Sequence, residues 1–173
     1  KVHGVRTYLF VTDGTVSGGA NLVNEVLRQV LLDLEKDGLL PTLNPTLYIQ
    51  FDNCSENKNK VVFAFLSHLV ERGTFDTIEI GFLMSGHTHE DVDQCFSVIG
   101  AHLQKRTTCC PSLPRFFAAV KHALETNGKD SPRVMEIGAT DVFDYNALYL
   151  GLVNPKVAQH SKPHQFRFFK FNG

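Results

Sequence analysis

Two patterns of hydrophobic and polar residues alternate along the first hundred positions of the chain. Apolar residues recur at helical spacing over residues 21–37 and 57–72, and a third pattern of this kind begins after Gly86. A stretch rich in β-branched and aromatic residues precedes each of these helices and predicts strands over residues 6–12, 46–51 and 77–84. This order predicts an α/β fold in which parallel neighbouring strands are joined by right-handed crossovers.

The predicted helices carry signals at their ends. Asn21 is expected to cap the N-terminus of the first helix. Gly38 and Gly73 stand just beyond the first and second helices, where a left-handed residue is favoured. The third helix is expected to bury an apolar stripe that consists of Val92, Phe96, Ile99 and Leu103.

The second half of the chain has a less regular pattern. It predicts a helix over residues 114–126 and strand-like segments over residues 133–139, 142–152 and 165–171. These elements are expected to pack onto or beside the sheet. We therefore expect an α/β core over residues 1–106 and a C-terminal region over residues 107–173.

The composition limits the partners and the location. The 17 Lys and Arg residues nearly balance the 18 Asp and Glu residues, so the net charge of −1 excludes binding of a polyanion through overall charge. Nucleic acid would have to contact local basic segments, such as residues 94–124 and 156–173, which contain no acidic residue. The longest apolar run, residues 61–66, is far shorter than the roughly 18 residues of a membrane-spanning helix, so no membrane contact is expected. The four cysteines show no CxxC spacing, which favours a reducing, intracellular compartment.

Polar clusters follow all three predicted strands of the first half. Asp13 follows the first strand, Asp52 and Asn53 follow the second, and residues 87–93 follow the third. Ligands gather outside the carboxyl ends of parallel strands, so these clusters are expected to converge. Carboxylates from separate strand ends repel one another unless a divalent cation neutralises them, and hard oxygen ligands favour Mg²⁺ or Mn²⁺. The pattern predicts a metal-dependent phosphoryl-transfer site.

Each cluster also has a structural explanation. Asp13 precedes a glycine, and the residues from Asp52 onward form a typical turn sequence. Asp91 with Thr88 fits a capping box, and an acid at position 90 complements the helix dipole. Asp93 lies past the cap at the edge of the apolar stripe, where an acid can reach a neighbouring strand end while its helix stays packed.

The string GHTHEDVD is similar to the His-x-His-x-Asp-His zinc motif of metallo-β-lactamase-like hydrolases. In this chain Val92 stands in place of the last histidine. Those enzymes set the motif in a β-sandwich, whereas here it follows a β-α-β-α-β pattern. A zinc hydrolase is therefore the less favoured alternative.

Two segments together carry a resemblance to a known family. FDNCSENKNK, residues 51–60, and LMSGHTHEDVDQCFSVI, residues 83–99, resemble a transposon-derived family of RNase H-like domains with the DDE-type transposase and integrase fold. The resemblance covers about residues 6–103 and departs from the family at Glu56, where its members usually have Gln. It implies an RNase H-like three-layer domain with a central mixed sheet. The strand over residues 6–12 would be the third strand, so the first two strands and their acid are expected upstream of Lys1.

The resemblance also implies a chemistry and the residues for it. Asp52 at the end of the fourth strand and Asp93 on the helix after the fifth would be catalytic and, with Asp91, would bind Mg²⁺ or Mn²⁺ in two-metal phosphodiester cleavage. Asn53 would orient Asp52 or a metal-bound water. Further supporting residues would be His87, His89 and Glu90.

The implied partner is DNA, and the implied location is the nucleus. The residues expected to contact DNA are Lys58, Lys60, Lys105 and Arg106. An oligomer assembled on DNA is a further expectation. The alternative to an active transposase or nuclease is a domesticated, catalytically inactive module that binds nucleic acid or protein.

Overall fold

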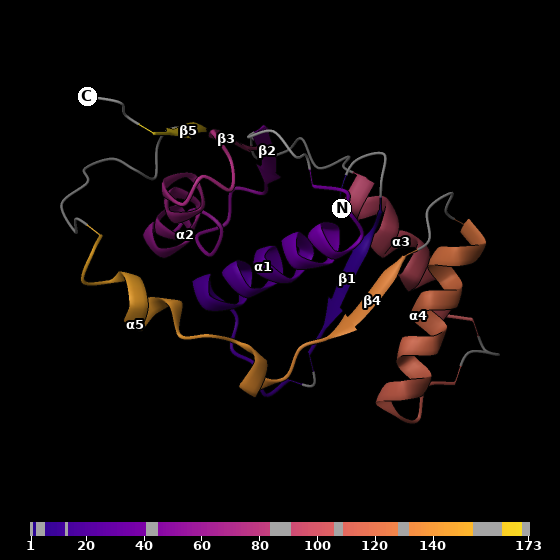
Figure 1. Ribbon diagram of the computed structural model, residues 1–173. Helices are drawn as coiled ribbons and strands as arrows, with labels where there is room; N and C mark the ends of the chain where they lie inside the picture. The colour runs from indigo at the N-terminus through magenta and orange to yellow at the C-terminus, as the bar shows by residue number, and fades with distance from the viewer. Residues whose placement is uncertain are drawn as a thin grey trace. The chain divides into compact units, whose positions relative to one another are not determined.

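The computed structural model describes residues 2, 6–12, 14–40, 45–83, 91–105, 109–127, 132–153 and 164–170. These residues form a mixed α/β fold with five α-helices and two sheets, which confirms the predicted α/β class (Figure 1). In chain order the elements are β1 (Tyr8–Val11), α1 (Ala20–Lys36), β2 (Thr46–Phe51), α2 (Lys60–Glu71), β3 (Thr77–Phe82), α3 (Asp91–Leu103), α4 (Leu113–Asn127), β4 (Arg133–Glu136), the 3₁₀ turn η1 (Ala139–Asp141), α5 (Tyr145–Tyr149) and β5 (Gln165–Phe169).

The strands pair in an order that differs from the expected single sheet. β2 and β3 are parallel, as predicted, and β5 pairs antiparallel with the other edge of β3. β1 instead pairs in parallel with β4 in a two-stranded sheet. The expectation that the first three strands form one continuous sheet is therefore wrong for the described residues. β1 and β4 associate because the adjacent side chains Leu9 and Val134 pack into one hydrophobic cluster.

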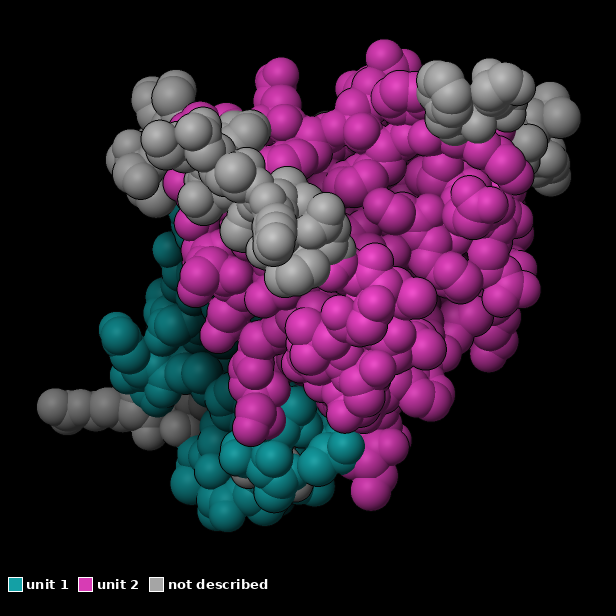
Figure 2. All heavy atoms as spheres, turned by 90° about the vertical axis from the view of Figure 1, so that its left-hand side faces the viewer, with its two compact units in different colours: residues 1–16, 87–139 teal, residues 17–86, 140–173 magenta. Residues whose placement is uncertain are grey.

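The chain divides into two compact units, which are described separately. Unit 1 contains residues 1–16 and 87–139, and unit 2 contains residues 17–86 and 140–173 (Figure 2). The chain leaves unit 2 after β3 and returns to it for α5 and β5, because β5 pairs with β3. These units follow different boundaries from the domains expected at 1–106 and 107–173, and that domain division stays a prediction.

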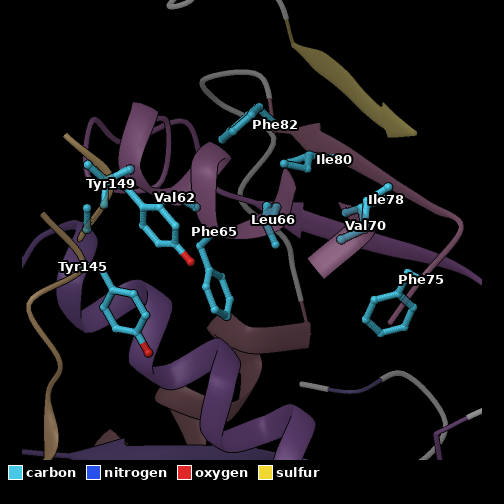
Figure 3. Packing of buried hydrophobic residues seen from close by; sticks show 12 residues of the cluster. Val62, Phe65, Leu66, Val70, Phe75, Ile78, Ile80, Phe82, Tyr145 and Tyr149 are labelled. Carbon is cyan, nitrogen blue, oxygen red and sulfur yellow. The ribbon is translucent and has the colours of Figure 1, made fainter. Parts of the chain in front are cut away.

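The core of unit 2 lies between α2 and one face of the β2-β3-β5 sheet. Val62 and Leu66 of α2 and Ile78 of β3 are completely buried (Figure 3). At the end of the sheet, the ring of Phe63 lies 4.6 Å from that of Phe166, measured between centroids. Alternate residues of β3 face this core, as expected for a strand with a period of two. The packing fixes α2 on the sheet and with it the connection from β2 into α2.

The helices of unit 2 begin and end at identifiable residues. The backbone N–H of Val61 donates a hydrogen bond to the side chain of Asn59, so α2 begins at Lys60, three residues after the predicted start at 57. Gly38 and Gly73 have φ angles of 67° and 74° and follow α1 and α2, which confirms their predicted role. The predicted cap at Asn21 is wrong. The capping position is Gly19, and the side chain of Asn21 instead accepts a hydrogen bond from the backbone of α5.

The segment over residues 142–152 contains a five-residue helix, Tyr145–Tyr149, in place of the predicted strand. The carboxylate of Asp144 accepts a hydrogen bond from the backbone N–H of Ala147 at 3.0 Å and caps the five-residue helix α5. Tyr145 and Tyr149, one helical turn apart, are both buried against the unit 2 core (Figure 3). Their spacing of four residues is typical of one face of a helix. The strand prediction for this segment did not take this spacing into account.

Unit 1 has a smaller core of its own. Ile99 of α3 packs with Val120 and Leu124 of α4 on one face of the β1-β4 sheet. The predicted apolar stripe of α3 is only half correct. Ile99 and Leu103 join the core, whereas Val92 and Phe96 are 44% and 57% exposed. Of the four stripe residues, only the two in the C-terminal half of α3 thus pack into the core that α4 shares.

The central place of α2 leads to a stability prediction. Leu66→Ala removes a completely buried side chain and should lower the free energy of unfolding by about 2–5 kcal/mol. Leu148→Ala, at a 60% exposed position, is the matched control and should change it by less than about 0.5 kcal/mol. Urea unfolding followed by circular dichroism measures both. Equal losses for the two variants would show that α2 does not anchor this core.

Candidate functional site

The first part of the candidate site is the turn that follows β2. Asp52 comes directly after the strand, and its Oδ1 accepts hydrogen bonds from the backbone N–H of Cys54 at 3.1 Å and from the side-chain amide of Asn57 at 2.7 Å. This Asx-type turn closes the connection between β2 and α2. The side chain and backbone of Cys54, together with Asn57, lower the pKa of Asp52 by hydrogen bonding. Asp52 is therefore ionised at neutral pH.

Lys58 occupies an unusual position in the same turn. The residue is 8% exposed, and its Nζ donates a hydrogen bond to Oδ1 of Asn53 at 3.0 Å. The ammonium also lies 4.9 Å from the centroid of the Phe82 ring. Within the described ranges no Asp or Glu side chain forms an ion pair with it. Asn53 thus orients Lys58. The expectation that Asn53 orients Asp52 or a metal-bound water stays a prediction.

A pocket of about 570 Å³ opens beside this turn within unit 2. The turn and the first residues of α2 form one wall, and α5 forms the other. The pocket is lined by Asn53, Ser55, Lys58, Asn59, Lys60, Val61, Asn146 and Leu150. Two of these residues are lysines and none is acidic, so the lining carries positive charge only.

A buried polar network holds the α5 wall in place. Glu25 of α1 is fully buried, pairs with Arg28 at 2.7 Å and accepts a hydrogen bond from the hydroxyl of Tyr145 at 3.0 Å. Burial acts to raise the pKa of Glu25, but hydrogen bonds from Arg28, Gln29 and Tyr145 outweigh it and leave the pKa lowered. Burial and the contact with Glu25 raise the pKa of Tyr145, which stays neutral and acts as a donor. This network ties α5 to α1.

The second predicted carboxylate lies in the other unit. Asp93 is exposed on the first turn of α3 in unit 1, whereas Asp52 belongs to unit 2. Pairing of the two carboxylates around one ion therefore stays a prediction. Among the described side chains, no group of three His, Cys, Asp or Glu residues could hold a metal ion. The predicted residues outside the described ones are Asp13, His87, His89, Glu90, Arg106 and the side chain of Asp91.

The predicted DNA contacts lie at separate places in the chain. Lys58 and Lys60 share the pocket, one as part of its turn and the other as the first residue of α2. Lys105 is exposed just after α3 in unit 1. The structure therefore brings two of the predicted basic residues, Lys58 and Lys60, to one pocket. Both follow Asp52 closely in the sequence.

Comparison with known proteins assigns the chain to a family. The family model described as a domain of unknown function (DUF7869) matches residues 2–173. The chain belongs to this family. No curated protein and no solved structure matches it. In the part of this DUF7869 domain that the structure describes, no helix is long and apolar enough to cross a membrane.

Several residues of the site in this DUF7869 domain were missed by sequence reasoning. Asn57 holds Asp52, Asn146 and Leu150 line the far wall of the pocket, and Glu25 anchors that wall. The spacing of Glu25 and Arg28, three residues apart on a helix, was a usable signal for an ion pair. Nothing in the local pattern could reveal the bond to Tyr145, which lies 120 residues away.

The Glu25 network predicts a specific dependence of stability on pH. Glu25→Gln should lower the free energy of unfolding by about 1–3 kcal/mol at pH 7, because Arg28 loses its buried partner. The pKa of Glu25 is below its ordinary value of 4.5, so its contribution is complete above pH 4.5 and is lost as the pH falls through the lower, folded-state pKa.

Unfolding experiments across this pH range on Glu25→Gln and on Glu35→Gln, an exposed position of the same helix, test this dependence. The Glu35 variant should follow the parent protein, whereas the Glu25 variant should lack this acid-dependent loss. An unchanged unfolding free energy for Glu25→Gln at pH 7 would contradict the structural role of the network.

Proposed function

We propose that this chain is a transposase-derived, RNase H-like domain that takes part in metal-dependent cleavage or strand transfer of DNA phosphodiester bonds. The single observation that carries the proposal is the ionised Asp52 at the carboxyl end of β2, next to a pocket with a positively charged lining. A carboxylate at this end of a parallel strand pair lies where active sites of open α/β sheets are built.

The connection after β3 supports the part proposed for Asp93. The parallel pair of β2 and β3 ends with Phe51 opposite Phe82, and the N–H of Leu83 donates a hydrogen bond to the carbonyl of Phe51 at 3.0 Å. The chain therefore leaves β3 directly beside the residue that precedes Asp52. Only residues 84–90 separate this point from α3, which carries Asp93 on its first turn.

The chemistry of the donors fits Mg²⁺ or Mn²⁺ at Asp52. Both ions prefer hard oxygen ligands, and Asp52 offers an exposed, ionised carboxylate whose orientation is fixed by Cys54 and Asn57. In the proposal, Asp93 and Asp91 would complete the ligand set. A bound metal would supply activation of the attacking hydroxyl and stabilisation of the leaving oxygen. His87, His89 and Glu90 would support this site.

The proposed partner is DNA, and the proposed setting is a nuclear protein that assembles on it. Lys105 and Arg106 would contact the backbone from unit 1, and Lys58 and Lys60 from unit 2. These assignments rest on the resemblance of the two motif segments and on the exposed position of Lys105.

A second candidate is a module that binds nucleic acid without cleaving it. The observation that favours it is the use of Asp52 as a structural acceptor, since its Oδ1 already closes the β2–α2 turn. A carboxylate kept only for this turn needs no metal. The two candidates make different predictions for removal of the Asp52 charge. The nuclease would lose cleavage, whereas the binding module would be unaffected.

Asp52→Asn separates these roles, because asparagine keeps an acceptor oxygen for the turn but removes the charge. Metal-dependent cleavage of supercoiled DNA by the full-length protein should fall on the order of 100-fold or more, while the free energy of unfolding changes little. Agarose-gel assays in Mg²⁺ and in Mn²⁺ measure cleavage. Asp76→Asn, an exposed carboxylate just before β3, is the matched control and should leave cleavage unchanged.

Two results would decide against the nuclease. Cleavage by Asp52→Asn at the parent rate would remove Asp52 from the reaction. Absence of cleavage by the parent protein in both metals, with DNA binding equal in parent and variant, would establish the binding module instead.

A further inference from the structure

Lys58 is a buried residue whose ammonium has no negatively charged partner in the described part of the chain. The residue is 8% exposed, and the contacts of its ammonium there are the amide oxygen of Asn53 and the face of the Phe82 ring. Neither group carries a net charge. Burial of an unpaired charge is costly, and a neutral hydrogen bond and a cation–π contact offset this cost only in part. The site therefore favours an anion beside Lys58.

The pocket that Lys58 lines has the chemistry to accept such an anion. Lys60 lies on the same wall, and the amides of Asn53 and Asn59 and the hydroxyl of Ser55 add polar groups. None of the eight lining residues named above is acidic, so these side chains do not repel a phosphate. Lysine ammonium groups are common ligands of phosphate in proteins.

The remainder of the pocket suits a larger group than phosphate alone. Leu150 presents apolar surface and is 64% exposed, whereas Val61 is 3% exposed and belongs to the core. Asn146 adds an amide that can both donate and accept hydrogen bonds. The volume of about 570 Å³ falls in the usual range for small-molecule sites. It has room for one nucleotide.

We propose that this pocket binds a single nucleotide unit, with its phosphate at Lys58 and Lys60 and its sugar and base against Leu150. The inference rests on the proposed function for the choice of a nucleotide as the anion. The nucleotide could belong to a DNA strand or be free in solution, and both sources present the same phosphate chemistry.

Binding of fluorescein-labelled hexathymidylate to the full chain, measured by fluorescence anisotropy in EDTA, tests the pocket without any metal. Lys58→Gln should weaken binding about 10- to 100-fold, the usual effect of losing a charge-assisted hydrogen bond. Leu150→Trp should block the pocket from its other wall and weaken binding to a similar degree. Because Leu150 is 64% exposed, this variant should fold even if Lys58→Gln does not.

Two controls match these changes outside the pocket. Lys36→Gln removes the same charge from the last residue of α1, and Leu148→Trp adds the same ring at a 60% exposed position of α5. Both should bind like the parent chain. Parent-like binding by Leu150→Trp, or an equal loss in Lys36→Gln and Lys58→Gln, would overturn the pocket assignment, and so would a lack of binding by the parent chain.

Unlabelled competitors identify the source of the nucleotide. Displacement of the probe by thymidine monophosphate supports a site for free nucleotides, and displacement by unlabelled hexathymidylate alone supports a site for a strand. Displacement by inorganic phosphate as effective as that by the mononucleotide would overturn the part given to Leu150. Asp52→Asn should bind the probe normally in EDTA, so failure of the pocket and failure of the proposed cleavage give different results.

Discussion

The packing of α2 on the β2-β3-β5 sheet is the constraint on which the candidate site depends. Val62 and Leu66 are completely buried against the sheet, so the start of α2 cannot move relative to the end of β2 without opening the core. The turn between them, residues 52–59, is thereby held at both ends. Its polar side chains are therefore placed by apolar packing outside the turn, and Lys58 contacts that core directly through the ring of Phe82.

Two buried charges near this core are treated in opposite ways. Glu25 has an arginine, a glutamine and a tyrosine hydroxyl as partners, and its burial is fully compensated. Among the residues that the structure describes, the ammonium of Lys58 contacts a neutral amide and an aromatic ring, and no acidic side chain pairs with it. The first arrangement is typical of a structural network, which here fixes α5 to α1. The second arrangement leaves the positive charge of Lys58 without an acidic partner in the described part of the chain, and we infer that an anionic ligand supplies that partner.

The local pattern of residues predicted the elements whose partners lie nearby in the chain. α1, α2, β2 and β3 each bury one regular face, and their ends carry glycine or asparagine signals, so they lie within three residues of the predicted bounds. The pairing of β1 with β4 was not predictable in this way, since it depends on Leu9 and Val134, 125 positions apart. The α5 segment was misassigned because its short run of aromatic and aliphatic residues also fits a strand.

The candidate site was predictable to a similar extent. Asp52 was expected to be either a turn residue or a ligand, and it demonstrably closes the turn. Lys58 was expected to contact DNA, and its burial and its contact with Phe82, 24 positions away, are not visible in any local pattern. The far wall of the pocket comes from Asn146 and Leu150, which reach the turn only through the tertiary contacts of α5.

The central proposal is that the ionised carboxylate of Asp52 binds a divalent metal ion. Paramagnetic line broadening by substoichiometric Mn²⁺, observed for the backbone amides of the ¹⁵N-labelled full chain, tests it most directly. The account predicts that the amide signal of Cys54 broadens in the parent chain and in Asp76→Asn, and that it does not broaden in Asp52→Asn. An unbroadened Cys54 signal in the parent chain, or equal broadening in Asp52→Asn, would contradict the proposal.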